Sequence, residues 1–393
     1  MSCTPTQIPL RYGCNPHQKH ARLTLPAEGA LRVVNGSPGY INMLDALGAW
    51  QLVRELKQVT GLASAASFKH TSPAGAAVAK PLSQAFARSQ MIDRPDLSPA
   101  AQAYARARGG DRMCSYGDLA AVSETVDADV ANLLKPEVSD GLIAPGYTDE
   151  ALAILKAKRK GGYLVMQIDP AYEPPASESR RIFGFTLEQD RNDGKISRGL
   201  LSGAVSKKKH IPDGAAQSLL VATVALKYTQ SNSVCVAYDG QVIGMGAGQQ
   251  SRVHCTRLAC DKADKWLLQH HPRVLDLPFK ADLPRAVRTN IVDQFLLWDQ
   301  LSPPEQDEVR RGLTKAVQPL SAQERADWIG RHDGIVISSD AFFPFRDNID
   351  RASRSHVQYV LQPGGSVRDD DVTAAADQYG MVMIHSGMRW FLH

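Results

Sequence analysis

Short apolar runs alternate with segments of helical periodicity along most of this chain. Between residues 42 and 56 apolar side chains recur at the three-to-four-residue spacing of an amphipathic helix. Strands are predicted at 141–144 and 162–168, and residues 233–238 and 241–245 flank an Asp-Gly pair that is typical of a hairpin turn. This alternation favours a layered α/β fold with helices on both sides of a sheet.

The pattern changes between residues 272 and 332, where charged helices replace the alternation. We therefore expect two α/β/α subdomains and a small helical insertion. The expected boundaries are 1–200 for the first subdomain, 201–271 plus 333–393 for the second and 272–332 for the insertion. Serine-flanked polar turns at Lys69–His70 and at Ser231–Ser233 suggest that the two subdomains are duplicated folds.

Composition excludes several classes of protein. The chain has 393 residues and 45 basic against 41 acidic side chains, a net charge of +4 that is too mild to indicate nucleic-acid binding. No stretch approaches the length of a membrane span, and the N-terminus lacks the features of a signal peptide. The six cysteines show no paired spacing, which predicts free thiols and a cytoplasmic protein.

The strongest chemical signal is Lys69-His70, at the end of a predicted strand that we expect to turn, through Pro73 and Gly75, into an Ala-rich helix. Histidine can accept a proton near neutral pH, and the neighbouring ammonium can stabilise an oxyanion. Acyl or formyl transfer to a weak nucleophile requires this pair of functions. The alternative is a solvated lysine beside a surface histidine.

Other segments carry weaker signals. The amide of Asn232 can donate to one substrate oxygen and accept from an amine, although an ordinary turn or helix cap also explains it. The glycine-rich run 244–251 leads to Arg252 and can hold an anion, but it matches neither the Walker pattern nor the dinucleotide fingerprint. Phe342, Phe343 and Phe345 can wall a heterocycle or fill the core, with Asp347 bonding ring nitrogens.

Arginines supply further anion-binding candidates. Arg11, followed by Tyr12, and Arg389 can each grip a phosphate, although isolated arginines are usually solvated. The cysteine and histidine spacings fit no zinc site, so we expect no catalytic metal.

Together these motifs resemble the family of bifunctional AICAR transformylase/IMP cyclohydrolase enzymes, where AICAR is aminoimidazole carboxamide ribonucleotide. The resemblance covers nearly the whole chain, from Leu10 to His393. Its specific segments are Ser67–Gly75, Tyr104–Gly109, Glu137–Gly141, Lys227–Val234, Gly246–Leu258 and Ser338–Arg351.

The resemblance implies two cytidine-deaminase-like α/β/α subdomains with a helical insertion and no deaminase zinc. It implies formyl transfer from 10-formyltetrahydrofolate to the 5-amino group of AICAR, in a homodimer whose active sites lie at the interface. Its catalytic residues map onto Lys69, His70 and Asn232. AICAR contacts map onto Arg11, Tyr12, Gly117, Asp140, Arg252, Phe342, Arg389 and His393, and folate contacts onto Val253, Asp347, Ser366 and Val367.

The sequence departs from the family pattern near its two ends, and residues 19–30 and 272–332 follow that pattern only loosely. The cyclohydrolase domain that precedes Arg11 in the family is missing, so we expect formyl-AICAR formation without IMP cyclohydrolase activity. The penultimate histidine of the family tail is Leu392 here. A non-catalytic folate- or nucleotide-binding module is the main competing hypothesis, and an acyl transferase with another donor is a third. The joint presence of Lys69, His70 and Asn232 argues against a pure binding module.

Overall fold

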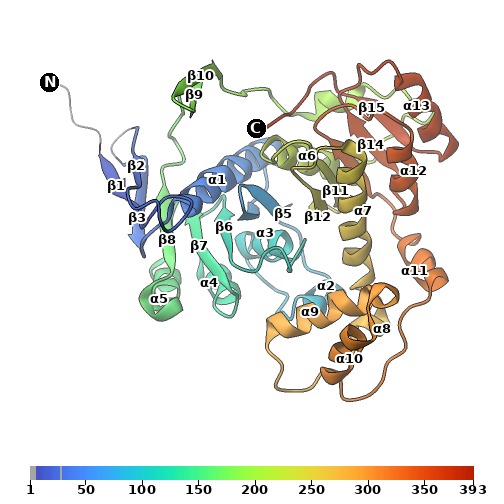
Figure 1. The fold of residues 1–393 in the computed structure, drawn as a ribbon, viewed down its shortest axis with the longest axis horizontal. Helices are drawn as coiled ribbons and strands as arrows, with labels where there is room; N and C mark the ends of the chain where they lie inside the picture. Colours follow the sequence, from blue (N-terminus) through green and yellow to red (C-terminus); the bar gives the residue numbers. More distant parts are fainter. Residues whose placement is uncertain (1–5, 27–28) are drawn as a thin grey trace.

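One continuous sheet runs through the computed structural model, which describes residues 6–26 and 29–393 (Figure 1). The 11 strands follow the order β15-β14-β13-β11-β12-β5-β4-β6-β7-β8-β3. The predicted α/β class is confirmed. Within the described residues, no helix combines the length and apolarity needed to cross a membrane.

The six strands of this sheet that come first along the chain form one half of it. They are β3 (Leu31–Asn35), β4 (Ser64–Lys69), β5 (Ser72–Val78), β6 (Asp118–Val122), β7 (Ser139–Ala144) and β8 (Leu164–Ile168). The accompanying helices are α1 (Tyr40–Thr60), α2 (Gln84–Ser89), α3 (Pro99–Arg108), α4 (Ala128–Leu134) and α5 (Asp149–Ala157).

The other half is built from later residues. Its strands are β11 (Val234–Tyr238), β12 (Gln241–Gly246), β13 (Val336–Ser339), β14 (Tyr359–Gln362) and β15 (Val382–His385). Its helices are α6 (Asp213–Lys227), α7 (Arg252–Leu268), α12 (Asp347–Arg354) and α13 (Asp369–Gln378). Between α7 and β13 lie α8 (Pro272–Leu275), α9 (Arg285–Leu296), α10 (Pro303–Arg311) and α11 (Ala322–Ile329).

Smaller elements lie outside the main sheet. Two hairpins are formed by β1 (Gln7–Pro9) with β2 (Arg22–Thr24) and by β9 (Ser177–Ile182) with β10 (Phe185–Asp190). Short 3-10 helices occupy Lys158–Gly161, Arg198–Ser202 and Trp298–Gln300.

The two halves repeat one topology. In each, a long helix precedes an antiparallel hairpin, β4–β5 or β11–β12, and three parallel strands follow. The first of these parallel strands, β6 or β13, pairs antiparallel with the first hairpin strand. The halves join where β5 and β12 run antiparallel, with Ala77 opposite Gln241, so equivalent strands point in opposite directions.

A glycine in the second hairpin strand repeats as well. An added Cβ at Gly75 would lie 2.1 Å from the Ala107 carbonyl oxygen of α3, and one at Gly244 would lie 2.0 Å from the Ala259 carbonyl oxygen of α7. Side chains at these positions would therefore keep the helix off the sheet. The same close helix-to-strand contact holds each half together.

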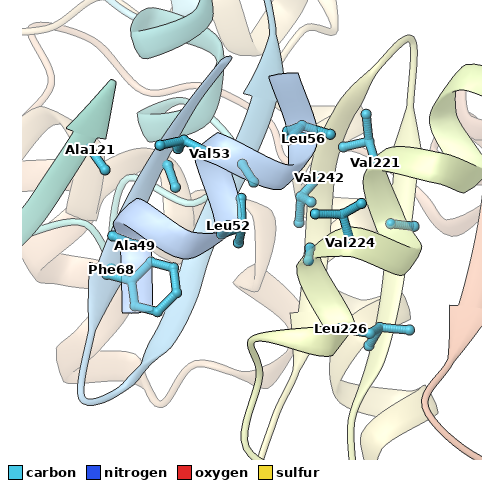
Figure 2. Packing of buried hydrophobic residues seen from close by; sticks show 14 of the residues in the cluster. Ala49, Leu52, Val53, Leu56, Phe68, Ala121, Val221, Val224, Leu226 and Val242 are labelled. Carbon is cyan, nitrogen blue, oxygen red and sulfur yellow. The ribbon is translucent and has the colours of Figure 1, made fainter. Parts of the chain in front are cut away.

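Apolar side chains cover both faces of the sheet. Helices α1 and α6 lie side by side on one face, where Leu52 and Leu56 pack in the same cluster as Val221 and Val224 (Figure 2). A buried ion pair joins these helices, because Lys227 Nζ lies 2.9 Å from Glu55 Oε2. The opposite face carries α3 and α4 on the first half and α7, α12 and the inserted helices on the second.

Several sequence predictions need correction. The Ala-rich segment after His70 is strand β5 rather than a helix, because it pairs with β4 and β12, and small side chains let α3 approach it closely. No strand was predicted between residues 170 and 198, where the structure has the exposed β9–β10 hairpin. The turn topologically equivalent to Lys69–His70 is Tyr238–Asp239, whereas Ser231–Ser233 precedes β11. The subdomain boundaries stay a prediction.

Free thiols are found where the structure describes cysteines. Cys14, Cys114, Cys235, Cys255 and Cys260 are unpaired, and Cys3 lies outside the described residues.

Candidate functional site

Strand directions bring the predicted site residues to one edge of the sheet. The turn after β4 lies at this edge, together with the starts of β6 and β7 and the ends of β12, β13, β14 and β15. We call it the Lys69 edge. The opposite edge, which holds the β11–β12 turn, is called the Asp239 edge. Residues more than 300 positions apart in sequence thus share the Lys69 edge.

The tight turn at Lys69–Thr71 presents the predicted base to solvent. His70 and Thr71 have φ values of 54° and 63°, in the left-handed region that non-glycine residues rarely adopt. The Thr71 amide donates a hydrogen bond to Asp45 Oδ1 at 2.7 Å, which stabilises this conformation. Asp45 lies on α1 with 5% exposure, and its burial raises the pKa of the carboxyl group. The His70 side chain is exposed and available to a ligand.

The Lys69 ammonium lies beside the loop that leads into β6. Its Nζ donates to the Tyr116 carbonyl oxygen at 2.5 Å, and two of its three protons can serve another acceptor. The next residue, Gly117, has a φ of 76°, and its amide donates to the Val138 carbonyl oxygen at 2.9 Å. The loop therefore holds Lys69 and the start of β6 together.

Arg11 and Tyr12 lie against the first turn of α1. The Arg11 Nη2 donates to Asn42 Oδ1 at 3.1 Å, and the Tyr40 amide donates to the Tyr12 carbonyl oxygen at 3.3 Å. Asn42 Oδ1 also accepts from the Gly39 amide at 2.8 Å, so one amide side chain caps the helix and orients the arginine. The guanidinium of Arg11 keeps free donors for an anion.

Asp140 follows the first residue of β7 at the same edge. Its carboxylate pairs with Arg159 at 2.9 Å, and both side chains are largely exposed. Asp140 is also close enough to Asp45 for the two carboxylates to repel, which adds to the raised pKa of Asp45. A ligand with a hydroxyl or amine donor would relieve this negative charge.

On the second half, Asp340 organises the loop that carries Asn232. Asp340 is fully buried, and its Oδ2 accepts from Ser231 Oγ at 2.7 Å and from the Ser233 amide at 2.9 Å. Its Oδ1 accepts from Arg252. The carboxylate thus fixes the backbone on both sides of Asn232.

Arg252 has its guanidinium inside the protein rather than at the surface. Its Nη2 donates to Asn232 Oδ1 at 2.7 Å, and its Nη1 bonds Asp340 and the Ser233 carbonyl oxygen. Because Oδ1 of Asn232 is taken, its Nδ2 is the atom left to face a ligand, and that atom makes a 3.3 Å bond to the Gln250 carbonyl oxygen. Arg252 therefore orients Asn232, and its predicted contact with AICAR stays a prediction.

Cys255 stabilises the backbone of Asn232. The Cys255 Sγ donates to the Asn232 carbonyl oxygen at 3.0 Å. Burial raises the pKa of this thiol to about 11, so it stays protonated and remains a donor.

The two loops touch within one chain. The Gln230 amide donates to Ser72 Oγ at 3.3 Å, two residues from Asn232 on one side and two from His70 on the other. The Lys69–His70 turn and the Asn232 loop are thus neighbours at the Lys69 edge. No bond joins the His70 and Asn232 side chains among the described residues.

The C-terminal tail closes this part of the edge. The Leu392 carbonyl oxygen accepts from the Ser231 amide at 3.0 Å, and its amide donates to Ser231 Oγ at 3.1 Å. Buried Trp390 anchors the tail, while Arg389 is exposed with its guanidinium carbon 4.5 Å from the Phe391 ring centre. Leu392 is therefore held in place by the hydrogen bonds of its backbone. His393 lies next to Phe391, with ring centres 5.4 Å apart.

The residues predicted to contact folate lie in the segments that follow β12, β13 and β14, beside the three phenylalanines. Phe343 is fully buried, whereas Phe342 and Phe345 are 41% and 54% exposed, so one aromatic fills the core and two remain for a ligand. Asp347 begins α12 with an exposed carboxylate. Ser366 and Val367 follow β14, and Val253 lies in the first turn of α7.

Sequence reasoning missed the supporting residues Asn42, Asp45 and Tyr116 and the anchoring role of Asp340. Asn42 and Asp45 are three residues apart near the start of α1, a spacing that places them on one face of the helix but does not indicate their partners. Asp340 was visible only as one of two carboxylates around the phenylalanines. The described residues include no cluster of three or more His, Cys, Asp or Glu side chains that could hold a metal ion.

Similarity to known proteins extends over nearly the whole chain. The sequence model of the AICARFT/IMPCHase bienzyme family matches residues 2–262. The chain is 31% identical over 389 residues to the bifunctional purine biosynthesis protein PurH of Cereibacter sphaeroides, and 31% identical over 391 residues to that of Roseobacter denitrificans. Each alignment covers 98% of this chain and 59% of the relative.

The chain therefore spans about 59% of the length of these curated relatives. On the match of the family model, the chain belongs to the AICARFT/IMPCHase bienzyme family.

Proposed function

We propose that this chain is an AICAR formyltransferase, which transfers the formyl group of 10-formyltetrahydrofolate to the 5-amino group of AICAR in cytoplasmic purine biosynthesis. Family membership supports the proposal. The observation that carries it is that the Lys69–His70 turn and the Asn232 loop lie at one edge of the sheet, so that two chains paired through this edge can bring His70 of one to Asn232 of the other.

The amine of AICAR is a weak nucleophile because its lone pair is delocalised into the imidazole and the carboxamide. As the nitrogen attacks the formyl carbon, His70 accepts the proton that the amine loses. The carbon–N10 bond of the folate then breaks, N10 takes up a proton, and tetrahydrofolate leaves. The exposed imidazole of His70 suits this exchange with the ligand.

Two donors stabilise the tetrahedral adduct in this mechanism. Lys69 supplies the ammonium protons that its bond to Tyr116 leaves free, and Asn232 supplies Nδ2. Loss of one such donor typically costs about 3–4 kcal/mol of transition-state stabilisation. Arg252 keeps the amide of Asn232 in the orientation that points nitrogen outward.

The remaining residues bind the two substrates. Arg11 and Arg389 are exposed guanidiniums suited to the phosphate, with Tyr12 and His393 beside them. Gly117, Asp140 and Phe342 complete the AICAR contacts. Asp347 anchors the pterin, with Val253, Ser366 and Val367 around it.

We also propose that the enzyme is a homodimer with two active sites at the interface. Exposed apolar side chains near the Lys69 edge support this, among them Tyr40, Leu44, Met113, Tyr116 and Val138. A partner subunit covering this edge would remove them from water.

The test is formation of formyl-AICAR by the purified chain, followed by absorbance. His70→Ala should lower kcat by about 10²–10⁴-fold, the usual contribution of a general base, and leave AICAR affinity nearly unchanged. His20→Ala is the matched control, because His20 is an exposed histidine outside the site. Turnover of His70→Ala within about tenfold of the wild type would show that another group is the base.

The same assay separates the competing functions. Binding of AICAR and folate without turnover would favour a non-catalytic module. Turnover with a different acyl donor, and none with 10-formyltetrahydrofolate, would favour a distinct acyl transferase.

A further inference from the structure

The Asp239 edge of the sheet carries a cleft of its own. Its volume is about 820 Å³, and its walls come from the segment before α6, the β11–β12 turn and the starts of β13, β14 and β15. Small-molecule sites typically occupy about 300–1,000 Å³. The cleft shares no residue with the proposed formyl-transfer site, which lies at the opposite edge.

The internal duplication makes this cleft the counterpart of the first half's ligand site. The β11–β12 turn at Tyr238–Asp239 occupies the position of Lys69–His70 in the repeat. Gly334 precedes β13 with a φ of 93°, as Gly117 precedes β6 with a φ of 76°. Gln358 lies at the start of β14 where Asp140 lies at the start of β7. The same backbone geometry is therefore built twice, with different side chains.

We propose that the Asp239-edge cleft binds a small phosphorylated aromatic molecule of the size of a nucleoside monophosphate. The proposal goes beyond the formyl-transfer activity, and it depends on residues outside the proposed formyl-transfer site.

The cationic wall of the cleft supplies the phosphate contact. Lys208 and His210 belong to the densest basic run of the chain, residues 207–210, and both line the cleft. The Lys208 ammonium lies over Gly380, since an added Cβ there would meet Nζ at 3.1 Å. Within residues 6–26 and 29–393, no carboxylate oxygen lies within the 4.0 Å ion-pair distance of Lys208.

The acidic residues of the cleft are already engaged. Asp239 pairs with Lys80 at 2.8 Å and with Arg106 at 3.2 Å. Asp333 accepts from Gln358 Nε2 at 2.9 Å and lies 3.5 Å from His356 Nε2. These bonds reduce the repulsion between the two carboxylates and a bound phosphate. The Lys208 ammonium is then the positive charge available to that phosphate.

Tyrosines supply the surface for an aromatic ring. Tyr238, Tyr359 and Tyr379 all line the cleft. The Tyr379 hydroxyl donates to Asp350 Oδ1 at 3.0 Å, which holds the ring in place, and the side chain remains 47% exposed. A fixed, exposed aromatic ring next to a free ammonium suits a ligand with both a planar ring and a phosphate.

The experiment is isothermal titration calorimetry with AMP, adenosine and inorganic phosphate as probes, on the full chain carrying Arg11→Ala so that the Lys69 edge contributes little. We expect AMP to bind one cleft per chain and to bind more tightly than adenosine or phosphate. Lys208→Glu and the double variant Lys208→Ala/His210→Ala should each weaken AMP binding at least about tenfold, because the phosphate loses its charge-assisted bonds.

Lys209→Ala is the matched control, since Lys209 belongs to the same basic run but its Nζ donates to the Ala204 carbonyl oxygen at 2.6 Å. It should leave AMP affinity unchanged. All four substituted positions are exposed, so circular dichroism should show intact folds. Absence of AMP binding, equal loss with Lys209→Ala, or equal affinities for AMP and phosphate would each overturn the proposal.

Discussion

The buried pair of Asp340 and Arg252 offers a stability test of the site's framework. In the substitution Asp340→Asn the side chain keeps its shape but loses its charge. Arg252 is 7% exposed and Asp340 is fully buried, so the guanidinium would be left in the interior without a counterion. Breaking such a pair from one side costs about 3–5 kcal/mol. Since Oδ2 also accepts bonds from Ser231 and Ser233, we expect the cost to fall within this range rather than below it.

The assay is urea unfolding followed by tryptophan fluorescence. The matched control is Asp371→Asn, which removes an exposed carboxylate that pairs with Arg368 at 3.1 Å. Exposed pairs of this kind contribute about 0–1 kcal/mol. The buried substitution should therefore lower the free energy of unfolding by several times the amount of the surface substitution.

Activity gives a second readout for the same variant. Without Asp340 the loop that carries Asn232 loses its anchor, and kcat for formyl transfer should fall about 10²-fold or more, as when an oxyanion donor is lost. Equal stabilities of Asp340→Asn and Asp371→Asn would refute the reasoning, because they would mean that Arg252 does not depend on Asp340.

Two further predictions concern regions away from the site. Burial lowers the pKa of His270 to about 4, so only the unfolded chain takes up a proton between about pH 6.5 and 4, and stability should fall by about 2 kcal/mol from pH 7 to pH 5. Urea unfolding of His270→Gln at both pH values should show a smaller fall, and an equal fall would contradict the assignment. Gly75→Ala places a Cβ 2.1 Å from the Ala107 carbonyl oxygen and should cost about 1–3 kcal/mol or more, measured by urea unfolding. Gly214→Ala, with no atom within 4 Å of the new Cβ, should change stability by less than about 1 kcal/mol, and similar losses in the two variants would count against the close α3 contact.

Periodicity predicted the elements whose side chains face a single core. Helix α1 was predicted at 42–56 and extends over Tyr40–Thr60, and the β11–β12 hairpin was placed within one residue of its observed bounds. Both carry apolar side chains at the spacing that their structure requires. Segments of small residues gave no such signal. Residues 72–78 are mostly Ala and Gly, and pairing with β4 and β12 makes them a strand.

The exposed β9–β10 hairpin escaped prediction for a different reason. All of its residues are exposed, so no buried face imposes an apolar alternation. Its six residue pairs from Ser177 to Asp190 are joined by backbone pairing, with a side-chain hydrogen bond from Gln189 Nε2 to Glu178 Oε1 at 2.6 Å.

Candidate site residues were easier to identify than their supports. Lys69, His70 and Asn232 lie in segments that are long enough to show the resemblance to the enzyme family. Asp45 and Asp340 act through contacts that join residues 26 and 107 positions apart, to Thr71 and Ser233, and a local pattern carries no trace of them. The inward orientation of Arg252 likewise depends on Asp340 and could not be read from its place after a glycine-rich loop.

Mixing two inactive variants tests most directly whether His70 and Asn232 act on the same AICAR across a dimer interface. Neither His70→Ala nor Asn232→Ala should transfer formyl groups at an appreciable rate alone. After the two are co-refolded, half of the dimers are hybrids, and each hybrid has one site with both native residues, so activity should recover to about a quarter of the wild-type value. No recovery, in a mixture shown by mass spectrometry to contain hybrids, would contradict a site shared between two chains.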